Sequence, residues 1–522
     1  MTEGQKRKTE ENSKRINNFV KLISKSRFLE YRACPKDAWF RLYMPELDEF
    51  KISISEQGRM DQGNIAEEHA KKLDIFSGFV EIKTRNFDSR KEIDLLMSQK
   101  APAIYQPTFV ADGFIVRCDM LVCNESTGKW DLYEIKATNS IKNDDSPRDH
   151  ISDLSFQTIV LERAEIDIGK KFIVHLNNKY IRKGDIDIEN LFLINDSTEQ
   201  VSAKIEITAQ QMENAKKYLN QKTEPKNGCN CHLYGRSRHC ATFGRSHPEI
   251  PEYSIHDLLR IGSSPSKLAE FVKNETYDLG EIGDTSDFSV TQQNQINTYK
   301  NNKEIINEKE ISNILDEYKY PLYFFDYETF APAIPIYSGY GTWQRIPIQF
   351  SLHIIDKKGG PLRHVEYLHQ ENSDPSEIVA KKLNEYIDPK GTVLAWNVSF
   401  EKNVTKEIAA RLSKYEKVLN RICLQMKDLS DIFSKQHYVH KDFRGRFAIE
   451  AVMKVLLPEM TYENLPYTGE DVGYVWWQDI ANQGLNPKER DQKAHLIKEY
   501  CKQDTFIMVE IFRILNDFVS KK

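Results

Sequence analysis

The chain has 522 residues, of which 40% are hydrophobic and 11% aromatic, so it is long and apolar enough for two or three packed domains. A net charge of −5 excludes binding of nucleic acid through overall charge, and no apolar run approaches the roughly 18 residues that span a bilayer. Without a signal-peptide core, a cytoplasmic protein with no membrane contact is expected, in which clustered members of the 8 cysteines suggest metal binding rather than disulfides.

The N-terminal part of the chain predicts a tail followed by helices. Residues 1–16 are charged, which is typical of a disordered tail. Residues 19–43 predict two helices separated at Cys34-Pro35, and Ser24 or Ser26 can cap the first of them. Residues 62–73 predict a further helix.

The next segment carries a candidate hydrolytic site. Residues 114–122 predict one strand that holds Asp119, and residues 130–137 predict its hairpin partner, on which Glu134 and Lys136 share a face. Asp119 and Glu134 are therefore candidate ligands of a divalent cation, and Lys136 can orient water or stabilise phosphoryl charge. The alternative is an ordinary ion pair between Glu134 and Lys136.

These motifs have a known counterpart. Asp119, Glu134-Ile135-Lys136 and the downstream Asp153-Leu154-Ser155-Phe156-Gln157 resemble the PD-(D/E)XK nucleases of the RecB type. The resemblance implies that Gln157 supports the metal site from a helix beyond the second strand.

The same family places an acid or a histidine on a helix upstream, after a glycine. Gly63 followed by Glu67 or Glu68 occupies that place, and the sequence leaves open which acid corresponds. A solvated helix face is the alternative for both acids.

Four cysteines form a pattern of one early and three late residues. They are Cys34, Cys229, Cys231 and Cys240. The pattern resembles the iron–sulfur staple of CRISPR-associated RecB-like exonucleases and of the AddB subunit, which implies a four-iron, four-sulfur cluster. The late trio departs from its relatives, because it reads C-x-C-x8-C where they begin with C-x-x-C. His232 and His239 make zinc the alternative, and free thiols are a third. The remaining cysteines lie in apolar surroundings and are predicted core residues: Cys118, Cys123, Cys423 and Cys501.

A second folded unit is expected after a connector. Residues 246–315 are polar and predict a helical connector. Residues 320–330 then predict a buried strand with Asp326 and Glu328 on one face. Two acids on one face are tolerated when Mg²⁺ or Mn²⁺ lies between them, whereas a solvated strand end is the alternative.

Several regular elements are predicted in the second unit. They are strands at residues 346–355, 362–368 and 392–396 and helices at residues 375–387 and 495–514. On the last helix, Tyr500 and Asp504 are four residues apart and share one face. Between these elements, residues 437–446 interleave basic and aromatic side chains, as on a nucleic-acid surface; a solvated loop is the alternative.

Three short motifs of this unit also have a counterpart. Asp326-x-Glu328, Asn397-x-x-Phe400-Glu401 and Tyr500-x-x-x-Asp504 resemble, in this order, the DEDD 3′–5′ exonucleases of the RNase H-like fold. The resemblance implies that the four acids hold two cations and that Tyr500 orients the attacking water. Glu401 stands where most members have Asp, so its arm is one methylene longer.

Taken whole, the chain resembles an uncharacterised bacterial family that joins both kinds of domain. The expected class is α/β, with a PD-(D/E)XK nuclease-like domain at 17–245, the connector at 246–315 and an RNase H-like DEDD domain at 316–522. The resemblance implies a metal-dependent nuclease with two hydrolytic centres, and a DNA exonuclease is the favoured expectation. An RNA exonuclease is an alternative. A nucleic-acid-binding scaffold with one or both centres inactive is the rival from another class.

Overall fold

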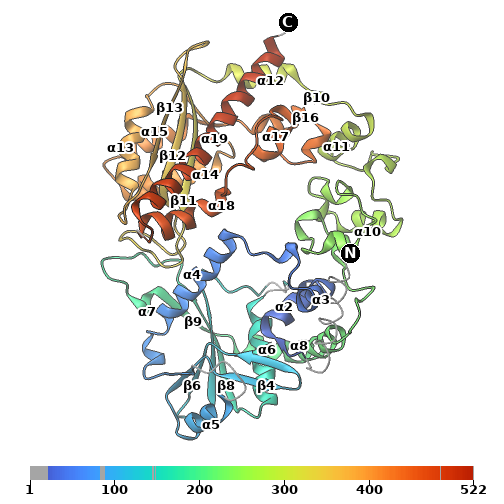
Figure 1. The fold of residues 1–522 in the computed structure, drawn as a ribbon, viewed down its shortest axis with the longest axis vertical. Helices are drawn as coiled ribbons and strands as arrows, with labels where there is room; N and C mark the ends of the chain where they lie inside the picture. Colours follow the sequence, from blue (N-terminus) through green and yellow to red (C-terminus); the bar gives the residue numbers. More distant parts are fainter. Residues whose placement is uncertain (1–20, 83–88, 144–145, 147–148, 483, 521–522) are drawn as a thin grey trace, which may run out of the picture.

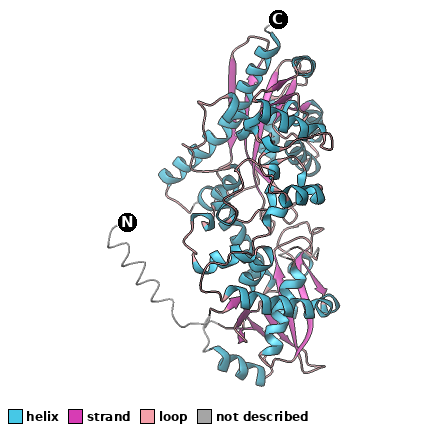
Figure 2. Cartoon of the chain, turned by 90° about the vertical axis from the view of Figure 1, so that its right-hand side faces the viewer, coloured by secondary structure: helices cyan, strands magenta, loops and turns pink. Residues whose placement is uncertain are grey.

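The protein is a mixed α/β molecule with its two largest sheets at opposite ends (Figure 1). The computed structural model describes residues 21–82, 89–143, 146, 149–482 and 484–520, so the predicted tail at 1–16 lies outside the described residues. Seen from the side, the two folded units follow one another along the long axis (Figure 2). Within the described ranges, no helix combines the length and the apolar character needed to cross a membrane.

The larger, six-stranded sheet belongs to the N-terminal unit and has the order β2-β3-β6-β7-β8-β9. Its strands are β2 (Val80–Glu81), β3 (Ala103–Tyr105), β6 (Met120–Cys123), β7 (Trp130–Lys136), β8 (Ile168–Leu176) and β9 (Phe192–Asp196). Strands β6 and β7 form an antiparallel hairpin, whereas β7 and β8 are parallel and are joined by helix α6 (His150–Arg163). Helix α6 is buried for most of its length because it packs between this sheet and helix α8 (Thr198–Leu219).

The prediction of one continuous strand at residues 114–122 is wrong. The chain forms β5 (Phe114–Arg117) in a small sheet with β1 (Ile23–Ser24) and β4 (Thr108–Ala111), and then enters the main sheet as β6. At the break, Cys118 donates its N–H to the Pro107 carbonyl at 3.1 Å, and the Asp119 carbonyl accepts from Gln106 at 3.0 Å. Because the apolar alternation continues through the break, periodicity alone cannot reveal it.

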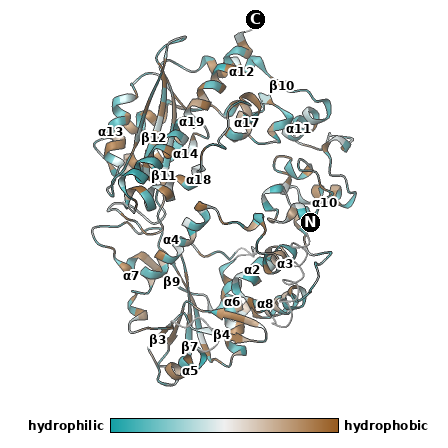
Figure 3. Ribbon diagram, viewed as in Figure 1, coloured by the Kyte–Doolittle hydropathy of each residue, from teal (hydrophilic) through white to brown (hydrophobic). Residues whose placement is uncertain are grey.

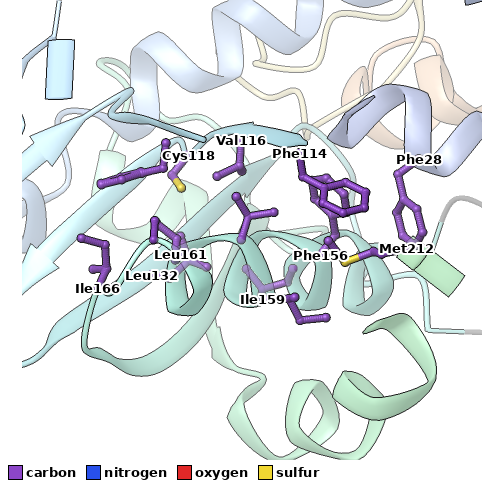
Figure 4. Packing of buried hydrophobic residues seen from close by; sticks show 14 of the residues in the cluster. Phe28, Phe114, Val116, Cys118, Leu132, Phe156, Ile159, Leu161, Ile166 and Met212 are labelled. Carbon is purple, nitrogen blue, oxygen red and sulfur yellow. The ribbon is translucent and has the colours of Figure 1, made fainter. Parts of the chain in front are cut away.

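Aromatic packing fixes the first helix, α2 (Lys25–Ala33), against this core. The Phe28 ring stacks on Phe156 of α6 at 5.0 Å, and Phe114 meets the same ring edge-on at 5.9 Å (Figure 4). Burying a phenyl side chain stabilises a fold by about 1.5–3 kcal/mol. The packing of Phe28 therefore sets the position of both ends of α2, where Lys25 and Cys34 lie.

The predicted helix boundaries near the N-terminus are confirmed in part. Ser24 is the cap of α2, since its hydroxyl accepts the Arg27 N–H at 3.3 Å, and α3 (Pro35–Tyr43) starts at the predicted break. Helix α4 (Ile54–Ala70) begins eight residues before the predicted position. Ser53 and Glu56 form a capping box there, which marks the start of the helix and was not used in the prediction.

The connector has a small apolar core of its own, which the polar composition did not predict. Its helices are α10 (Pro265–Lys273), α11 (Val290–Asn301) and α12 (Glu308–Asp316). The core residues are Ile255, Leu258, Ile261, Leu268, Leu279, Ile282, Phe288 and Ile296.

Helices α10 and α13 (Ser376–Tyr386) both mix hydrophilic and hydrophobic residues, as expected of helices with one buried face (Figure 3).

The C-terminal unit is built on a sheet with the order β13-β12-β11-β14-β15. Its strands are β11 (Leu322–Phe330), β12 (Ile346–Ile355), β13 (Leu362–Leu368), β14 (Thr392–Ala395) and β15 (Met426–Asp428). Strand β12 is antiparallel to both of its neighbours, and the pairs β11–β14 and β14–β15 are parallel. The predicted bounds of β12 and β13 are confirmed.

The two faces of β11 pack against different helices. Tyr323 and Phe325 belong to the core formed with α13, α14 (Ser399–Arg411) and α15 (Glu416–Gln425). Leu322 and Phe324 belong to the core formed with α17 (Ile449–Leu456) and α19 (Pro487–Ser520). Since side chains alternate along a strand, Asp326 and Glu328 lie on the face of Leu322 and Phe324, toward α19.

The two units also meet away from the connector. Ser55 of α4 donates its N–H to Asp471 of α18 (Gly469–Val475) at 2.9 Å, and the Gln62 side chain accepts the Ala333 N–H at 2.9 Å. Ala333 and Ile334, in the loop 331–345 after β11, are part of a hydrophobic cluster of the N-terminal unit. The loop therefore packs the C-terminal sheet onto the N-terminal one.

Candidate metal centres

Glu134 lies at the middle of the N-terminal candidate site. Its carboxylate is 1% exposed, and Oε1 accepts from both Lys25 and Lys136 at 2.6 Å. Oε2 accepts from Gln157 Nε2, also at 2.6 Å. The structure thus brings the predicted residues Glu134, Lys136 and Gln157 into direct contact.

Two further residues complete this network and were not named as site residues from the sequence. Asp153 accepts from Lys136 at 2.6 Å and from Gln157 at 3.1 Å, and its carboxylate lies 3.5 Å from Lys25. Asp153 stands four residues before Gln157 on α6, so the two share one face of the helix, and this spacing could have predicted Asp153 as a site residue. Lys25 carries no such signal, because only the packing of α2 onto α6 brings it to Glu134.

Asp119 and an acid of α4 lie near Glu134. Asp119 Oδ2 accepts the Ile135 N–H at 2.7 Å, an arrangement made possible by the break before β6. Glu67 Oε1 accepts from the Tyr105 hydroxyl at 2.7 Å and from Gln106 at 2.9 Å, whereas Glu68 is exposed and pairs with Lys71. Glu67 is thus the α4 acid that faces the site.

Charge in this site is unevenly distributed. Burial and then the Glu134 carboxylate raise the pKa of Asp119 well above its usual range. Burial opposes ionisation of Glu134 as well, but the Lys136 and Lys25 ammonium groups hold the pKa of Glu134 below its usual range. The site therefore combines carboxylate oxygens, which suit a hard divalent cation, with two lysines that carry the compensating charge.

The four cysteines of the sequence pattern lie together. Each sulfur of Cys34, Cys229, Cys231 and Cys240 is within 4.8 Å of the others, so this group could hold a metal ion. Cys34 comes from the junction of α2 and α3, and the other three come from the segment after α8. The two segments are tied together, because Lys36 donates its N–H to the Gly228 carbonyl at 3.2 Å and Thr242 donates to Asp37 at 2.9 Å.

The spacing of the sulfurs limits what they can hold without moving. Cys229 and Cys240 are 3.7 Å apart at Sγ. A tetrahedral ion with sulfur at about 2.3 Å has sulfur–sulfur edges of about 3.8 Å. His232 and His239 bond the carbonyls of Cys229 and Tyr234 through ring nitrogens and are not in the metal-ligating group. The donor set is thus four thiols, without the two predicted alternative histidine ligands.

The C-terminal candidate centre contains one residue that the sequence reading placed in the ordinary core. Asp326, Glu328 and Cys501 offer ligand atoms within 4.8 Å of one another, and the Cys501 thiol donates to Asp326 Oδ2 at 3.4 Å. The core prediction for Cys501 is correct in burial but misses this contact. Cys501 precedes Asp504 by three residues on α19, a spacing that places both on one side of the helix.

Glu401 reaches this centre from a sharp turn. Asn397 has a φ of 61°, a left-handed conformation that Asn tolerates well, and Asp428 accepts the N–H groups of Asn397 and Val398 at 3.2 and 2.9 Å. The turn starts α14, which carries Glu401 into the interior, where it is 2% exposed. Its Oε2 is buried without a hydrogen-bond partner among the described residues.

Asp504 and two tyrosines complete the centre. The Tyr462 hydroxyl donates to Asp504, and the rings of Tyr462 and Tyr500 are 5.5 Å apart. Burial and then the charges of Asp504 and Glu328 raise the pKa of Tyr500 far above its usual range, so its hydroxyl keeps its proton. Tyr462 was not predicted, and its position 42 residues before Asp504 leaves no local pattern to find it.

The acids of this centre are costly to ionise together. Burial raises the pKa of Asp326 to about 7, and burial with the Asp326 charge raises that of Glu401 to about 9. Burial and neighbouring carboxylates also raise the pKa values of Glu328 and Asp504 well above their usual range. Buried carboxylates need protons, donors or a cation, and the orphaned oxygen of Glu401 fits a cation here.

Comparison with known proteins covers part of the chain. Residues 323–448 match the model of a domain of unknown function, DUF2779. The match includes Asp326, Glu328 and Glu401 but ends before Tyr500 and Asp504. The uncharacterized protein MG366 of Mycoplasma genitalium is 27% identical over 222 residues, which are 38% of this chain and 32% of that protein. The chain thus spans about a third of the length of this relative.

Proposed function

We propose that the protein is a metal-dependent nuclease with two hydrolytic centres, with DNA as the favoured substrate. The observation that carries the proposal is that two buried and two half-buried acids from β11, α14 and α19 lie near one another, with one Glu401 oxygen unpaired. The sheet order β13-β12-β11-β14-β15, with β12 reversed, supports the RNase H-like assignment that the motifs imply.

In the C-terminal centre, Asp326, Glu328, Glu401 and Asp504 would hold Mg²⁺ or Mn²⁺. When bound, the ions supply a water of lowered pKa and neutralise charge on the leaving oxygen. Tyr462 orients the Asp504 carboxylate through its hydrogen bond. Tyr500 keeps its proton and is placed one helical turn from Asp504, so it donates a hydrogen bond that orients the attacking water.

In the N-terminal centre, Glu67, Asp119 and Glu134 would be the oxygen ligands of a second metal site. Gln157 holds Glu134 in place, and Lys136 lies where it can stabilise phosphoryl charge. This donor set and the order of β6, β7, α6 and β8 support the PD-(D/E)XK assignment.

One observation favours a second function for the N-terminal centre. Lys25 and Lys136 both bind Glu134 Oε1, so this carboxylate is neutralised by the chain itself. Such a balanced network is compatible with a centre that binds nucleic acid and does not cut it. The protein would then be a C-terminal exonuclease with an N-terminal binding module.

For the cysteine centre, the sequence pattern and the sulfur spacing favour different metals. The pattern of one early and three late cysteines favours a four-iron, four-sulfur cluster, whereas the 3.7 Å separation of Cys229 and Cys240 favours a single tetrahedral ion such as zinc. In either case we propose a structural role, because the four thiols connect the first helices to the segment after α8.

Digestion assays on single-stranded DNA and RNA with Mg²⁺ or Mn²⁺ test these proposals. Asp504→Ala should remove one activity and Glu134→Ala the other, and Asp517→Ala is the matched control, since Asp517 is exposed on the same helix as Asp504. Full activity of the double variant Glu134→Ala/Asp504→Ala would overturn the nuclease proposal. Loss of cleavage in Asp504→Ala alone, with no effect of Glu134→Ala, would support the binding role of the N-terminal centre.

A further inference from the structure

We propose that a groove whose middle part is lined by arginines, between the cysteine centre and the C-terminal carboxylates, binds the backbone of single-stranded nucleic acid. This inference rests on the proposed nuclease function and assigns it a substrate path. The groove is made by three parts of the chain that are far apart in sequence: the cysteine segment, the connector and the region around residues 440–455.

Three neighbouring hollows form the groove. The first, of about 470 Å³, is lined by Cys34, Cys231 and Cys240 and shares Arg238 with the second, of about 600 Å³. The second shares Arg444 and Arg446 with the third, of about 760 Å³. Because each hollow shares lining residues with the next, the three adjoin one another in a row, an arrangement suited to a linear ligand.

The charge of the middle hollow is positive in a chain whose net charge is negative. Its lining has one acid, Asp257, and five arginines, which are Arg236, Arg238, Arg260, Arg444 and Arg446. A local excess of arginine attracts polyanions, and the planar guanidinium pairs well with phosphate oxygens.

These arginines fall into two groups. Arg236 is fixed by Asp257 at 2.6 Å, and Arg444 by Glu252 at 2.7 Å. Arg238, Arg260 and Arg446 are exposed, and no ion pair among the described residues includes them. The first two arginines shape the wall, and the other three leave their donors free for phosphates.

One exposed aromatic ring lies beside a free arginine, and a second follows another free arginine in the sequence. The Arg238 guanidinium is 4.0 Å from the centroid of the Tyr234 ring, which is 38% exposed. Phe447 follows Arg446 directly and is 41% exposed. Rings of this kind stack on unpaired bases, which favours a single strand over a duplex.

The far end of the groove lies toward the C-terminal centre. Glu450 of α17 lines the third hollow, and α17 packs against α19, the helix that carries Asp504 and Tyr500. A strand that leaves the middle hollow in this direction approaches the carboxylates that would cut it. Of the interleaved residues at 437–446, Arg444 and Arg446 line this path, whereas Tyr438 and Phe443 are buried in the core of the C-terminal unit.

Binding measurements without cleavage test the groove. The full chain is titrated, without added divalent ions, into a fluorescent single-stranded oligonucleotide of about 20 nucleotides, and anisotropy is followed at several salt concentrations. The triple variant Arg238→Ala/Arg260→Ala/Arg446→Ala should bind at least tenfold more weakly. The logarithm of its binding constant should also depend less steeply on the logarithm of the salt concentration, by about 0.7 in slope for each phosphate that the variant no longer neutralises.

A matched control removes the same charge elsewhere. Arg90, Arg363 and Arg513 are partly exposed and form ion pairs on other surfaces, so their triple alanine variant should bind as the wild type does. The charge-retaining variant Arg238→Lys/Arg260→Lys/Arg446→Lys should recover much of the binding. Together with equal melting temperatures of all variants, it distinguishes weaker phosphate binding from a damaged fold.

Three outcomes would overturn the proposal that the groove binds single-stranded nucleic acid. They are equal weakening by both alanine triples, tighter binding of duplex than of single strand, and equal competition by polyglutamate, which would indicate an acidic protein partner. Failure of the nuclease proposal looks different: the wild type would bind the oligonucleotide through these arginines and leave it uncut when Mn²⁺ is added.

Discussion

The indole N–H of Trp343 donates a 2.7 Å hydrogen bond to the carbonyl of Ala137, across the contact between the two folded units. Ala137 directly follows Lys136 of the N-terminal centre, and Trp343 lies in the loop that leaves β11, the strand of Asp326 and Glu328. Thr342 adds a 2.9 Å hydrogen bond to Asn139. The segments that lead away from the two carboxylate centres are therefore bound to each other.

The variant Trp343→Phe keeps an aromatic ring of smaller size and removes the N–H donor, leaving the Ala137 carbonyl without its partner. We expect a loss of about 1–3 kcal/mol at the contact between the units, hence a melting temperature a few degrees lower. The control is Trp396→Phe, which removes a 3.0 Å bond to Phe447 within the C-terminal unit. An unchanged melting temperature of Trp343→Phe would contradict the stabilising role of this contact between the units.

Lys25 should compete with a cation for Glu134, because its ammonium contacts Oε1 at 2.6 Å. In Lys25→Met, we expect the metal-free protein to be less stable, since a buried carboxylate loses one of its partners. Mn²⁺ should restore more stability to this variant than to the wild type, and calorimetric titration should show tighter Mn²⁺ binding. Lys51→Met, at an exposed ion pair with Asp48, is the control, and unchanged or weaker binding in Lys25→Met would contradict the prediction.

The stability of the metal-free C-terminal unit should fall as pH rises. Asp326 and Glu401 have folded-state pKa values of about 7 and about 9, above the ordinary values of about 4. From about pH 4 upward the unfolded chain loses these protons while the folded chain keeps them, so the free energy of unfolding decreases until pH passes each folded pKa. Melting temperatures without divalent ions should decline between pH 5 and 8, and Asp326→Asn should flatten the decline up to about pH 7. A rise with pH in both proteins would contradict the burial of these acids.

The cysteine centre predicts a bound metal whose loss unfolds its surroundings. If the centre holds the iron–sulfur cluster that the sequence pattern favours, protein purified without oxygen should be brown and contain iron and sulfide. If it holds the single ion that the sulfur spacing favours, the protein should be colourless and contain one zinc. Cys240→Ser should lower the metal content and the melting temperature, whereas Cys423→Ser, outside both metal-ligating groups, should change neither. Metal-free wild-type protein with full stability would exclude the structural role.

The two tyrosines of the C-terminal centre should have separable effects. Tyr500→Phe should slow cleavage by roughly a hundredfold, because the attacking water loses the hydrogen bond that orients it, and leave Mn²⁺ affinity unchanged. Tyr462→Phe should change Mn²⁺ affinity as well, because it frees a ligand oxygen of Asp504. Titration calorimetry and initial rates on the same substrate separate the two effects, and identical behaviour of both variants would contradict the assigned roles.

Local patterns predicted the elements that local forces decide. The alternation along β12 and β13 and the break at Cys34-Pro35 depend on residues that are neighbours in the sequence, and their predicted positions are confirmed. Lys25 and Tyr462 could not be predicted, because their places depend on packing between helices far apart in the chain. The break before Asp119 was missed for a different reason. Its hydrogen bonds to residues 106 and 107 interrupt a strand whose apolar pattern continues.

Time-resolved digestion of a single-stranded oligonucleotide, labelled separately at its 5′ and 3′ ends, tests the central claim most directly. The full chain with Mn²⁺ should release labelled mononucleotide at once from the 3′ end and shorten the 5′-labelled strand stepwise, and Glu134→Ala should keep this pattern. Asp326→Ala should abolish it, because the variant loses a metal ligand of the C-terminal centre. Stepwise digestion from the 5′ end only, or unchanged digestion by Asp326→Ala, would contradict the assignment of that centre as a 3′–5′ exonuclease.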